Sequence, residues 1–204
     1  MIFDFFGVIA RLADPAGRRA IEETVDLDPA VLWEGFLRHR RAYDLDEIDG
    51  HRFWEAVLGT RLTPTQAQRL VDLDVASLST VDANAVEVVR ELRRRPLRLA
   101  LLSNLPVDLL QWHRANTPVL AEFDVVHASC RTGLGKPDPA AFTSVLRDLG
   151  VRADRAVLVD DHEPNIEAAG RLGIRGVHVT PTTDLRAELA DALAPALADT
   201  RQVT

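Results

Sequence analysis

Five short apolar runs mark the chain, at residues 1–3, 97–102, 124–129, 156–159 and 176–179. Hydrophobic residues dominate each run instead of alternating with polar ones, which is typical of parallel strands covered on both faces. A strand with one face in water would carry polar residues at every second position. The runs therefore predict five buried parallel strands.

Helical patterns separate the later strands, at residues 82–95, 138–150 and 163–173. The first begins at Asp82, and the second begins at Asp138, continues with Pro139 and stops at Gly150, which are the residue types that start and end helices. Strands and helices that alternate at this spacing predict βαβ units. The fold class we expect is α/β, with a doubly wound, Rossmann-like parallel sheet.

Residues 14–78 interrupt this alternation, because they contain no strand pattern and their apolar residues recur at helical spacing. We interpret them as a small helical insertion after the first strand, so that residues 1–13 and 79–204 form the α/β core. The aromatic residues of the insertion are expected to form its own hydrophobic centre. The apolar positions concerned are Val31, Leu32, Phe36, Leu37, Phe53, Trp54, Val57 and Leu58.

Composition narrows the class of protein. A chain of 204 residues with 47% hydrophobic and 27% charged residues suits one globular domain with an insertion. A formal net charge of −7 argues against binding to nucleic acid or to an acidic membrane surface. No apolar run reaches 18 residues and no basic segment precedes a hydrophobic one at the start, so neither a membrane span nor a signal peptide is expected. The single cysteine, Cys130, suits a reducing cytoplasm.

One lysine stands among many arginines. The chain has 24 lysine and arginine residues together, and only Lys136 is a lysine. Arginine serves wherever a generic cation is needed, whereas lysine offers a compact point charge with three rotatable donors. The residue type at position 136 therefore indicates a specific chemical role, although an ordinary surface lysine is the simpler alternative.

Polar residues follow four of the predicted strands. In an open α/β sheet, ligands bind outside the carboxyl ends of the strands, so these residues are expected to meet at one edge. Taken singly, each group has a structural explanation as a turn, a helix start or a cap. Their order along the sheet is what favours a site. They are Asp4 after the first strand, Ser103 and Asn104 after the second, Lys136 after the third, and Asp160 and Asp161 after the fourth.

This mixture of groups favours phosphate chemistry. Three crowded carboxylates require a cation among them, and oxygen ligands shared with a phosphate suit Mg²⁺. Ser103, Asn104 and Lys136 would supply hydrogen-bond donors and positive charge to an anionic group. Asp4 could then attack phosphorus and form an aspartyl-phosphate, which water hydrolyses.

Four segments carry a resemblance to the haloacid dehalogenase superfamily of hydrolases, subfamily I, over nearly the whole chain. "FDFFGVI", "LLSN", "GKPDP" and "VLVDDHEPNIEAAGRLGI" are similar to its four motifs in order. The resemblance implies a nucleophile at Asp4, a phosphate-binding hydroxyl at Ser103, a charge-stabilising Lys136 and metal-binding acids at Asp160 and Asp161. It also implies that the insertion is the helical C1 cap, that Mg²⁺ is the cofactor, and that the reaction is phosphomonoester hydrolysis.

Phe6 departs from that pattern. Phosphatases of this family usually carry Asp two residues after the nucleophile, where it protonates the leaving group and later activates water. Phe6 still offers its backbone carbonyl to a metal, but it has no acid–base group. Such a group typically contributes about 10²–10⁴-fold in rate.

Three functions are compatible with these residues. The first is a Mg²⁺-dependent phosphatase of a small phosphorylated metabolite, acting in the cytoplasm as a monomer or homodimer. The second is a 2-haloacid dehalogenase, in which Asp4 would attack carbon; such enzymes also lack the second Asp, but the Asp160–Asp161 pair weighs against this interpretation. The third is a non-catalytic relative that binds a phosphorylated ligand.

Further residues are candidates for substrate choice or for support of the site. An arginine of the insertion could reach a second anionic group of the substrate, although a solvated helix face is the simpler interpretation. His162 follows the acidic pair, either as a proton relay or as an ordinary loop histidine. Asn165 is expected to orient Lys136 or Asp161. The candidates within the insertion are Arg38, Arg40, Arg41 and Tyr43.

Overall fold

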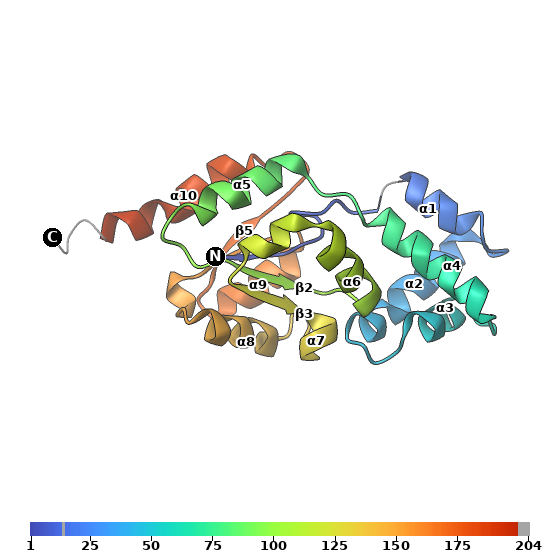
Figure 1. The fold of residues 1–204 in the computed structure, drawn as a ribbon. Coiled ribbons are helices and arrows are strands. Elements are labelled where there is room, and N and C mark those ends of the chain that lie inside the picture. Colours follow the sequence, from blue (N-terminus) through green and yellow to red (C-terminus); the bar gives the residue numbers. More distant parts are fainter. Residues whose placement is uncertain (14, 200–204) are drawn as a thin grey trace.

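Five parallel strands form one sheet at the centre of the protein (Figure 1). The computed structural model describes residues 1–13 and 15–199. The sheet order is β3-β2-β1-β4-β5, with crossovers on both sides of β1, so the predicted doubly wound α/β fold is confirmed. The strands are β1 (Ile2–Phe3), β2 (Ala100–Ser103), β3 (Val125–Ala128), β4 (Val157–Asp160) and β5 (Arg175–His178).

The register aligns the ends of the strands. Phe3 of β1 lies beside Leu101 of β2 and Val159 of β4. One residue further, the backbone N–H of Asp4 donates to the carbonyl of Val159 at 2.8 Å. The polar residues that follow or end β1, β2 and β4 therefore emerge at the same edge of the sheet.

Helices cover both faces of the sheet, and alternate strand residues point to opposite faces. Phe3, Leu101 and Val159 pack against α5 (Ala83–Arg93) and α10 (Leu185–Asp199) on one face. Ile2, Ala100 and Leu158 pack against α8 (Pro139–Leu149) and α9 (Glu163–Arg171) on the other. Burial on both faces explains why the runs are continuously apolar.

The caps expected from the sequence start and end these helices. The Asp82 carboxylate accepts hydrogen bonds from the backbone N–H groups of Asn84 and Ala85 at the start of α5. Asp138 accepts one from Ala140 at the start of α8, and Gly150 ends that helix in a left-handed conformation with φ of 69°. Side chains of this type satisfy the backbone donors that a helix start leaves unpaired.

The sequence pattern does not predict every element. It misses α6 and α10, and it misses the short segments η1 (Pro118–Glu122), α7 (Ser129–Thr132) and η2 (Ala153–Arg155). The first of these helices, α6 (Val107–Asn116), follows Pro106, which provides no side-chain cap, and its buried face includes His113. The sequence of α6 therefore shows neither a capping residue at its start nor a purely apolar buried face.

Between β1 and α5 the described residues are mainly helical, and their organisation as one insertion with the bounds 14–78 stays a prediction. The four helices are α1 (Pro15–Glu22), α2 (Pro29–Asp44), α3 (Gly50–Leu58) and α4 (Pro64–Ser77), and they lie beside the carboxyl edge of the sheet (Figure 1). Their buried residues form a separate apolar cluster in which Tyr43 stacks on Phe53 with ring centroids 4.6 Å apart. Asp14, the first residue of the predicted insertion, and residues 200–204 of the predicted core lie outside the described residues.

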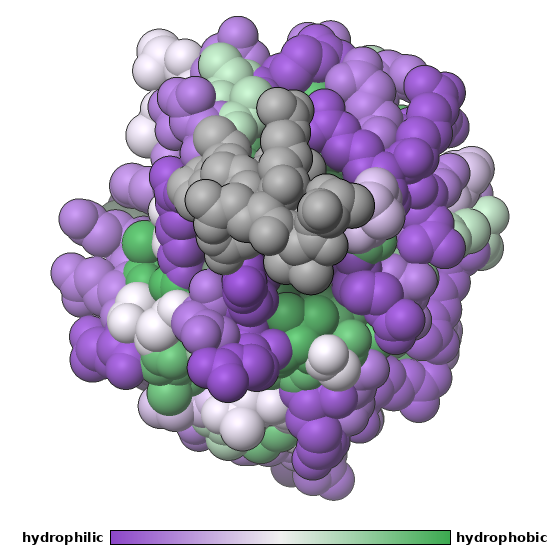
Figure 2. All heavy atoms as spheres, turned by 90° about the vertical axis from the view of Figure 1, so that its left-hand side faces the viewer, coloured by the Kyte–Doolittle hydropathy of each residue, from purple (hydrophilic) through white to green (hydrophobic). Residues whose placement is uncertain are grey.

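The surface at the opposite end of the protein is largely polar. Figure 2 shows this end, where hydrophilic side chains surround smaller apolar areas. Among the helices in the described part of the chain, none combines the length and the apolar content that crossing a lipid bilayer requires.

Candidate active site

The structure brings the predicted site residues to one edge of the sheet. Asp4, Asp160 and Asp161 offer carboxylate oxygens that all lie within 4.8 Å of one another. Asp4 follows β1, the central strand, and Asp160 ends the neighbouring β4. Ser103 ends β2 on the other side of β1. Their gathering follows from the parallel topology, in which all carboxyl ends share one edge.

Lys136 is the positive centre of this cluster. Its ammonium nitrogen lies 2.8 Å from Oδ1 of Asp4 and 2.6 Å from Oδ2 of Asp160. Only 3% of the residue is exposed. Burial alone would lower the pKa of Lys136, but the two carboxylates outweigh it and raise that pKa, so the group is a cation at neutral pH.

Asp4 is held by one of its two carboxylate oxygens. Oδ1 accepts a hydrogen bond from the backbone N–H of Phe5 at 2.6 Å as well as the contact from Lys136. Burial raises the pKa of Asp4 to about 6, against the opposing effect of Lys136 and with a further rise from Asp160. Within the described residues, Oδ2 has no comparable partner and is the oxygen left for chemistry.

The two acids after β4 differ in their surroundings. Both oxygens of Asp160 are engaged: Oδ2 by Lys136, and Oδ1 by the backbone N–H of His162 and by the Asn165 amide, each at 2.9 Å. The Asp161 carboxylate instead faces Gly7, where an added Cβ would lie only 2.1 Å from Oδ2. Gly7 has φ of 77°, so both its conformation and the space require glycine.

This donor set fits a hard divalent cation. The cluster holds three carboxylates and one ammonium group, and burial together with Asp160 raises the pKa of Asp161. Carboxylates close together at a buried site repel one another unless a cation lies between them. Carboxylate oxygens are the ligands that Mg²⁺ prefers. A cavity of about 870 Å³, lined in part by Gly7 and Asp161, adjoins the cluster.

Ser103 has an unsatisfied hydroxyl. Its Oγ is buried and has no hydrogen-bond partner in the described structure. An unpaired buried hydroxyl costs about 1–3 kcal/mol, so its presence at the end of β2, at the same edge of the sheet as Asp4, points to a ligand that pairs with it. An anionic oxygen would accept a hydrogen bond from this hydroxyl.

The two asparagines contact groups that the sequence did not indicate. The Asn104 amide bonds to the backbone of Lys136, and the prediction that Asn104 binds phosphate remains a prediction. Asn165 was expected to orient Lys136 or Asp161, but its side chain donates to Asp160. Asn165 lies in the first turn of α9, just beyond the end of β4. Its side chain therefore reaches back to Asp160, the last residue of that strand.

The Phe6 side chain packs in a cluster of aromatic rings. Its ring lies edge-on to Phe5 and to His113, with centroids 5.1 and 5.7 Å away. His113, which the sequence did not single out, is 1% exposed and is held by Thr117 and by the carbonyl of Leu78. Apolar and neutral groups therefore occupy the place where a second acid would stand.

Between pH 7 and pH 5, we expect His113 alone to lower the free energy of unfolding by about 2 kcal/mol. Burial lowers the pKa of His113 to about 4, from a model-peptide value of 6.5. The unfolded chain therefore binds the proton first, and stability falls as the pH drops below 6.5 and further toward 4. Urea denaturation of wild type and His113→Gln at both pH values should show a weaker pH dependence in the variant. The same dependence in both proteins would contradict this account.

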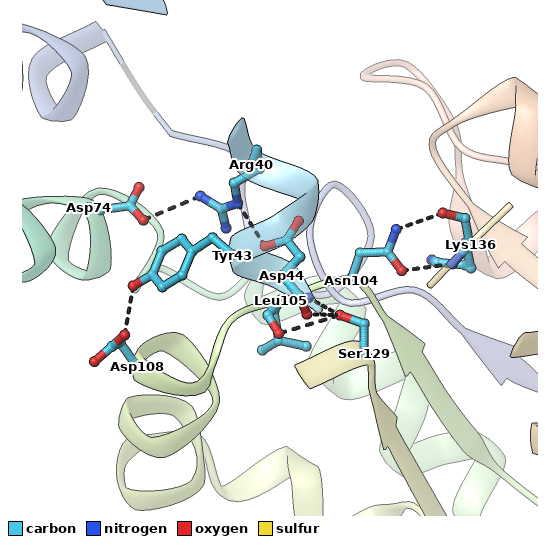
Figure 3. Close-up of polar contacts among 9 residues, drawn as sticks. All are labelled: Arg40, Tyr43, Asp44, Asp74, Asn104, Leu105, Asp108, Ser129 and Lys136. Atoms are coloured by element: carbon cyan, nitrogen blue, oxygen red, sulfur yellow. Dashed lines mark hydrogen bonds and ion pairs between the residues drawn. The ribbon is translucent and has the colours of Figure 1, made fainter. Parts of the chain in front are cut away.

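Polar contacts join the helical insertion to the core (Figure 3). The Ser129 hydroxyl donates to the carbonyl of Asp44 at the end of α2, and the Tyr43 hydroxyl donates to Asp108 of α6 at 2.7 Å. Arg40, one of the candidates for substrate binding, pairs with Asp44 at 2.7 Å and with the buried Asp74 at 3.2 Å. The positive charge of Arg40 is therefore paired with two carboxylates of the insertion itself.

The other two arginines proposed as candidates for substrate binding lie at the surface of the insertion. Arg41 is exposed, and Arg38 forms an exposed ion pair with Glu34. Arg38 and Arg41 therefore belong to a solvated helix face, which is the simpler of the two interpretations of the sequence.

Known proteins resemble this chain in sequence. A model of the family described as haloacid dehalogenase-like hydrolase matches residues 1–173. Phosphoserine phosphatase of Thermus thermophilus is 37% identical over 176 residues, which cover 82% of this chain and 66% of that enzyme. The chain thus spans just under two thirds of this relative's length.

Solved structures share the fold at low sequence identity. A variant of a HAD family enzyme from Bacteroides thetaiotaomicron, crystallised with magnesium and inorganic phosphate, has a TM-score of 0.76 at 19% identity, covering 91% of this chain and 96% of that one. L-2-haloacid dehalogenase from Xanthobacter autotrophicus has a TM-score of 0.66 at 20% identity, covering 95% and 81%. The same architecture therefore serves proteins of different chemistry.

Proposed function

Because this chain belongs to the haloacid dehalogenase-like hydrolase family, we propose that it is a Mg²⁺-dependent phosphatase of a small phosphorylated metabolite. The observation that carries the proposal is the Lys136 ammonium group, which bridges Asp4 and Asp160 at the carboxyl edge of the sheet. The unpartnered hydroxyl of Ser103, at the end of β2 on the same edge of the sheet, supports an anionic ligand. The phosphatase relative adds support for phosphate esters as the substrate class.

The metal would be held by Asp4, Asp161 and the backbone carbonyl of Phe6, with Asp160 completing the acidic cluster. When bound, Mg²⁺ supplies positive charge to the phosphoryl oxygens and offsets the repulsion between carboxylates. Asp160 is already engaged by Lys136, His162 and Asn165, so its main role in the proposal is to fix Lys136.

Asp4 acts as the nucleophile in this scheme. Its Oδ2 attacks phosphorus, the bond between phosphorus and the leaving-group oxygen breaks, and an aspartyl-phosphate forms on Asp4. Lys136 and the Ser103 hydroxyl stabilise the negative charge on the phosphoryl oxygens. Water then attacks phosphorus, which releases inorganic phosphate and regenerates the Asp4 carboxylate.

The leaving group receives no proton from position 6. Phe6 has no acidic group, and its ring is packed against Phe5 and His113. The departing oxygen must take its proton from water or leave as an anion. Esters whose leaving group is stable as an anion should therefore react fastest.

We also propose that residues 14–78 act as a cap over this site. The C-terminal end of α2 already touches the core, where Ser129 donates to the carbonyl of Asp44. A Cβ added to Gly135, next to Lys136, would lie 3.3 Å from Leu45 of the insertion. A helical cap in this position would exclude water from the phosphoryl group.

Phe6→Asp should raise the turnover of alkyl phosphates by about tenfold or more, because it supplies the missing general acid. The wild type with Mg²⁺ should hydrolyse p-nitrophenyl phosphate and acetyl phosphate much faster than alkyl phosphates, and the variant should narrow that gap. Initial rates on these substrates, with and without EDTA, provide the measurement.

Phe5→Leu serves as the control, since it disturbs the same aromatic group without adding an acid. If Phe6→Asp leaves alkyl-phosphate turnover unchanged while remaining folded, the missing-acid explanation is wrong. Chloride release from a 2-haloacid without added metal would instead favour the dehalogenase alternative.

A further inference from the structure

We infer that Asn104 is a positioning residue, whose side-chain amide fixes the backbone of Lys136 and so holds the ammonium group between Asp4 and Asp160. This inference concerns the machinery of the proposed phosphatase and rests on it only for the expected effect on turnover. It assigns Asn104 a role different from direct contact with phosphate.

The contacts are reciprocal. The Asn104 side-chain N–H donates to the carbonyl of Lys136 at 2.8 Å, and the backbone N–H of Lys136 donates to Oδ1 of Asn104 at 2.8 Å (Figure 3). A primary amide offers one donor and one acceptor side by side, which matches the N–H and C=O of a single residue. Alanine at position 104 would remove both bonds.

Lys136 needs such support because its loop is not part of a helix or strand. The residue lies between α7 and α8, in a turn, whereas Asn104 follows directly after β2 in the sheet. A lysine side chain is long and loses conformational entropy when it is fixed. Tying its backbone to the end of a central strand limits the positions from which the ammonium group can reach two carboxylates.

Gly135 makes the close approach feasible. A Cβ added there would lie 3.3 Å from Oδ1 of Asn104 and 3.3 Å from Leu45, which is tighter than most contacts of a real Cβ. The backbone of the loop therefore approaches Asn104 closely, and Leu45, the residue that follows α2 of the insertion, lies near the same point.

The chain offers a direct probe of Lys136, because it contains no other lysine. Protein labelled with ¹³C-lysine gives one side-chain Cε–Hε signal, which can be followed by NMR in the absence of metal and phosphate. The test compares wild type, Asn104→Ala, Asn104→Asp and the control Asn116→Ala. Asn116 donates to the carbonyl of Trp112 at the exposed end of α6, so this control removes an exposed asparagine whose side chain bonds within its own helix.

We expect the lysine signal to move toward that of a solvent-exposed lysine in Asn104→Ala and to stay unchanged in Asn116→Ala. Asn104→Asp keeps an acceptor for the Lys136 N–H and should give an intermediate shift. Supporting groups of this kind typically change activity by about 10–100-fold, so kcat of Asn104→Ala on p-nitrophenyl phosphate should fall within that range with KM little changed. Asn104→Asp should be the less impaired of the two.

An unchanged lysine signal in folded Asn104→Ala overturns the inference. So does an increase in the inhibition constant of inorganic phosphate with kcat unchanged, because direct anion binding would produce that result. If the signal moves as expected but even the wild type hydrolyses no phosphate ester, the proposed function fails and the positioning role of Asn104 stands.

Discussion

Asp4→Asn is expected to abolish phosphate-ester turnover, with a loss of roughly 10⁴-fold or more. Asparagine has the same shape, and its oxygen can still accept from Lys136 and from the Phe5 N–H, whose partner is Oδ1 in the wild type. Its amide cannot attack phosphorus. Because Lys136 keeps Asp160 as a partner, the variant should remain folded, and steady-state rates on p-nitrophenyl phosphate with Mg²⁺ can be compared directly.

A matched control makes this result specific. Asp28→Asn applies the same chemical change at the exposed N-cap of α2, where asparagine caps equally well, and should leave turnover unchanged. Residual turnover near the wild-type rate in Asp4→Asn would exclude Asp4 as the nucleophile. If wild type and variant both bind inorganic phosphate and neither turns over any ester, the non-catalytic alternative is correct.

Lys136→Met should destroy activity and lower the free energy of unfolding by about 3–5 kcal/mol, because it leaves buried carboxylates without their cation. The destabilisation should depend on pH. Asp4 already has its pKa raised to about 6, and losing Lys136 raises that pKa further. Protonation of Asp4 at lower pH then relieves the uncompensated charge, so the variant loses less stability at pH 5 than at pH 8. Urea denaturation at the two pH values measures the difference.

Lys136→Arg separates charge from shape. Guanidinium keeps the positive charge but is larger and planar, and the Lys136 side chain is only 1% exposed. We expect this variant to recover part of the stability that Lys136→Met loses, without recovering turnover. Equal stability of wild type and Lys136→Met at both pH values would refute the charge-compensation account.

The fold was largely predictable because its main signals are local. Continuous apolar runs identify strands buried on both faces, and Asp82 and Asp138 each cap a helix through backbone groups two or three residues away. Parallel topology then dictates that the groups after β1, β2 and β4 meet. The convergence of Asp4 with Asp160 follows from these steps alone.

Other features of the site depend on contacts between distant segments. Asn104 lies 32 residues before Lys136 in the chain, and nothing in "LLSN" indicates that its partner is a lysine backbone. His113 lies in α6, a helix without a capping signal, so its contact with Phe6 could not be foreseen. Arg40 is one of three arginines within four residues, and only packing decides that it pairs with Asp74.

Phe6 links two properties that are usually independent in an enzyme. Its ring packs against the main apolar cluster of the sheet and also against the cluster around α6. Any mutation that introduces an acid at this position therefore also alters the packing of two parts of the core. Under the proposed function, Phe6→Asp would thus gain an acid at the expense of packing around His113, and during evolution substitutions around His113 would be expected to restore the stability that such a change loses.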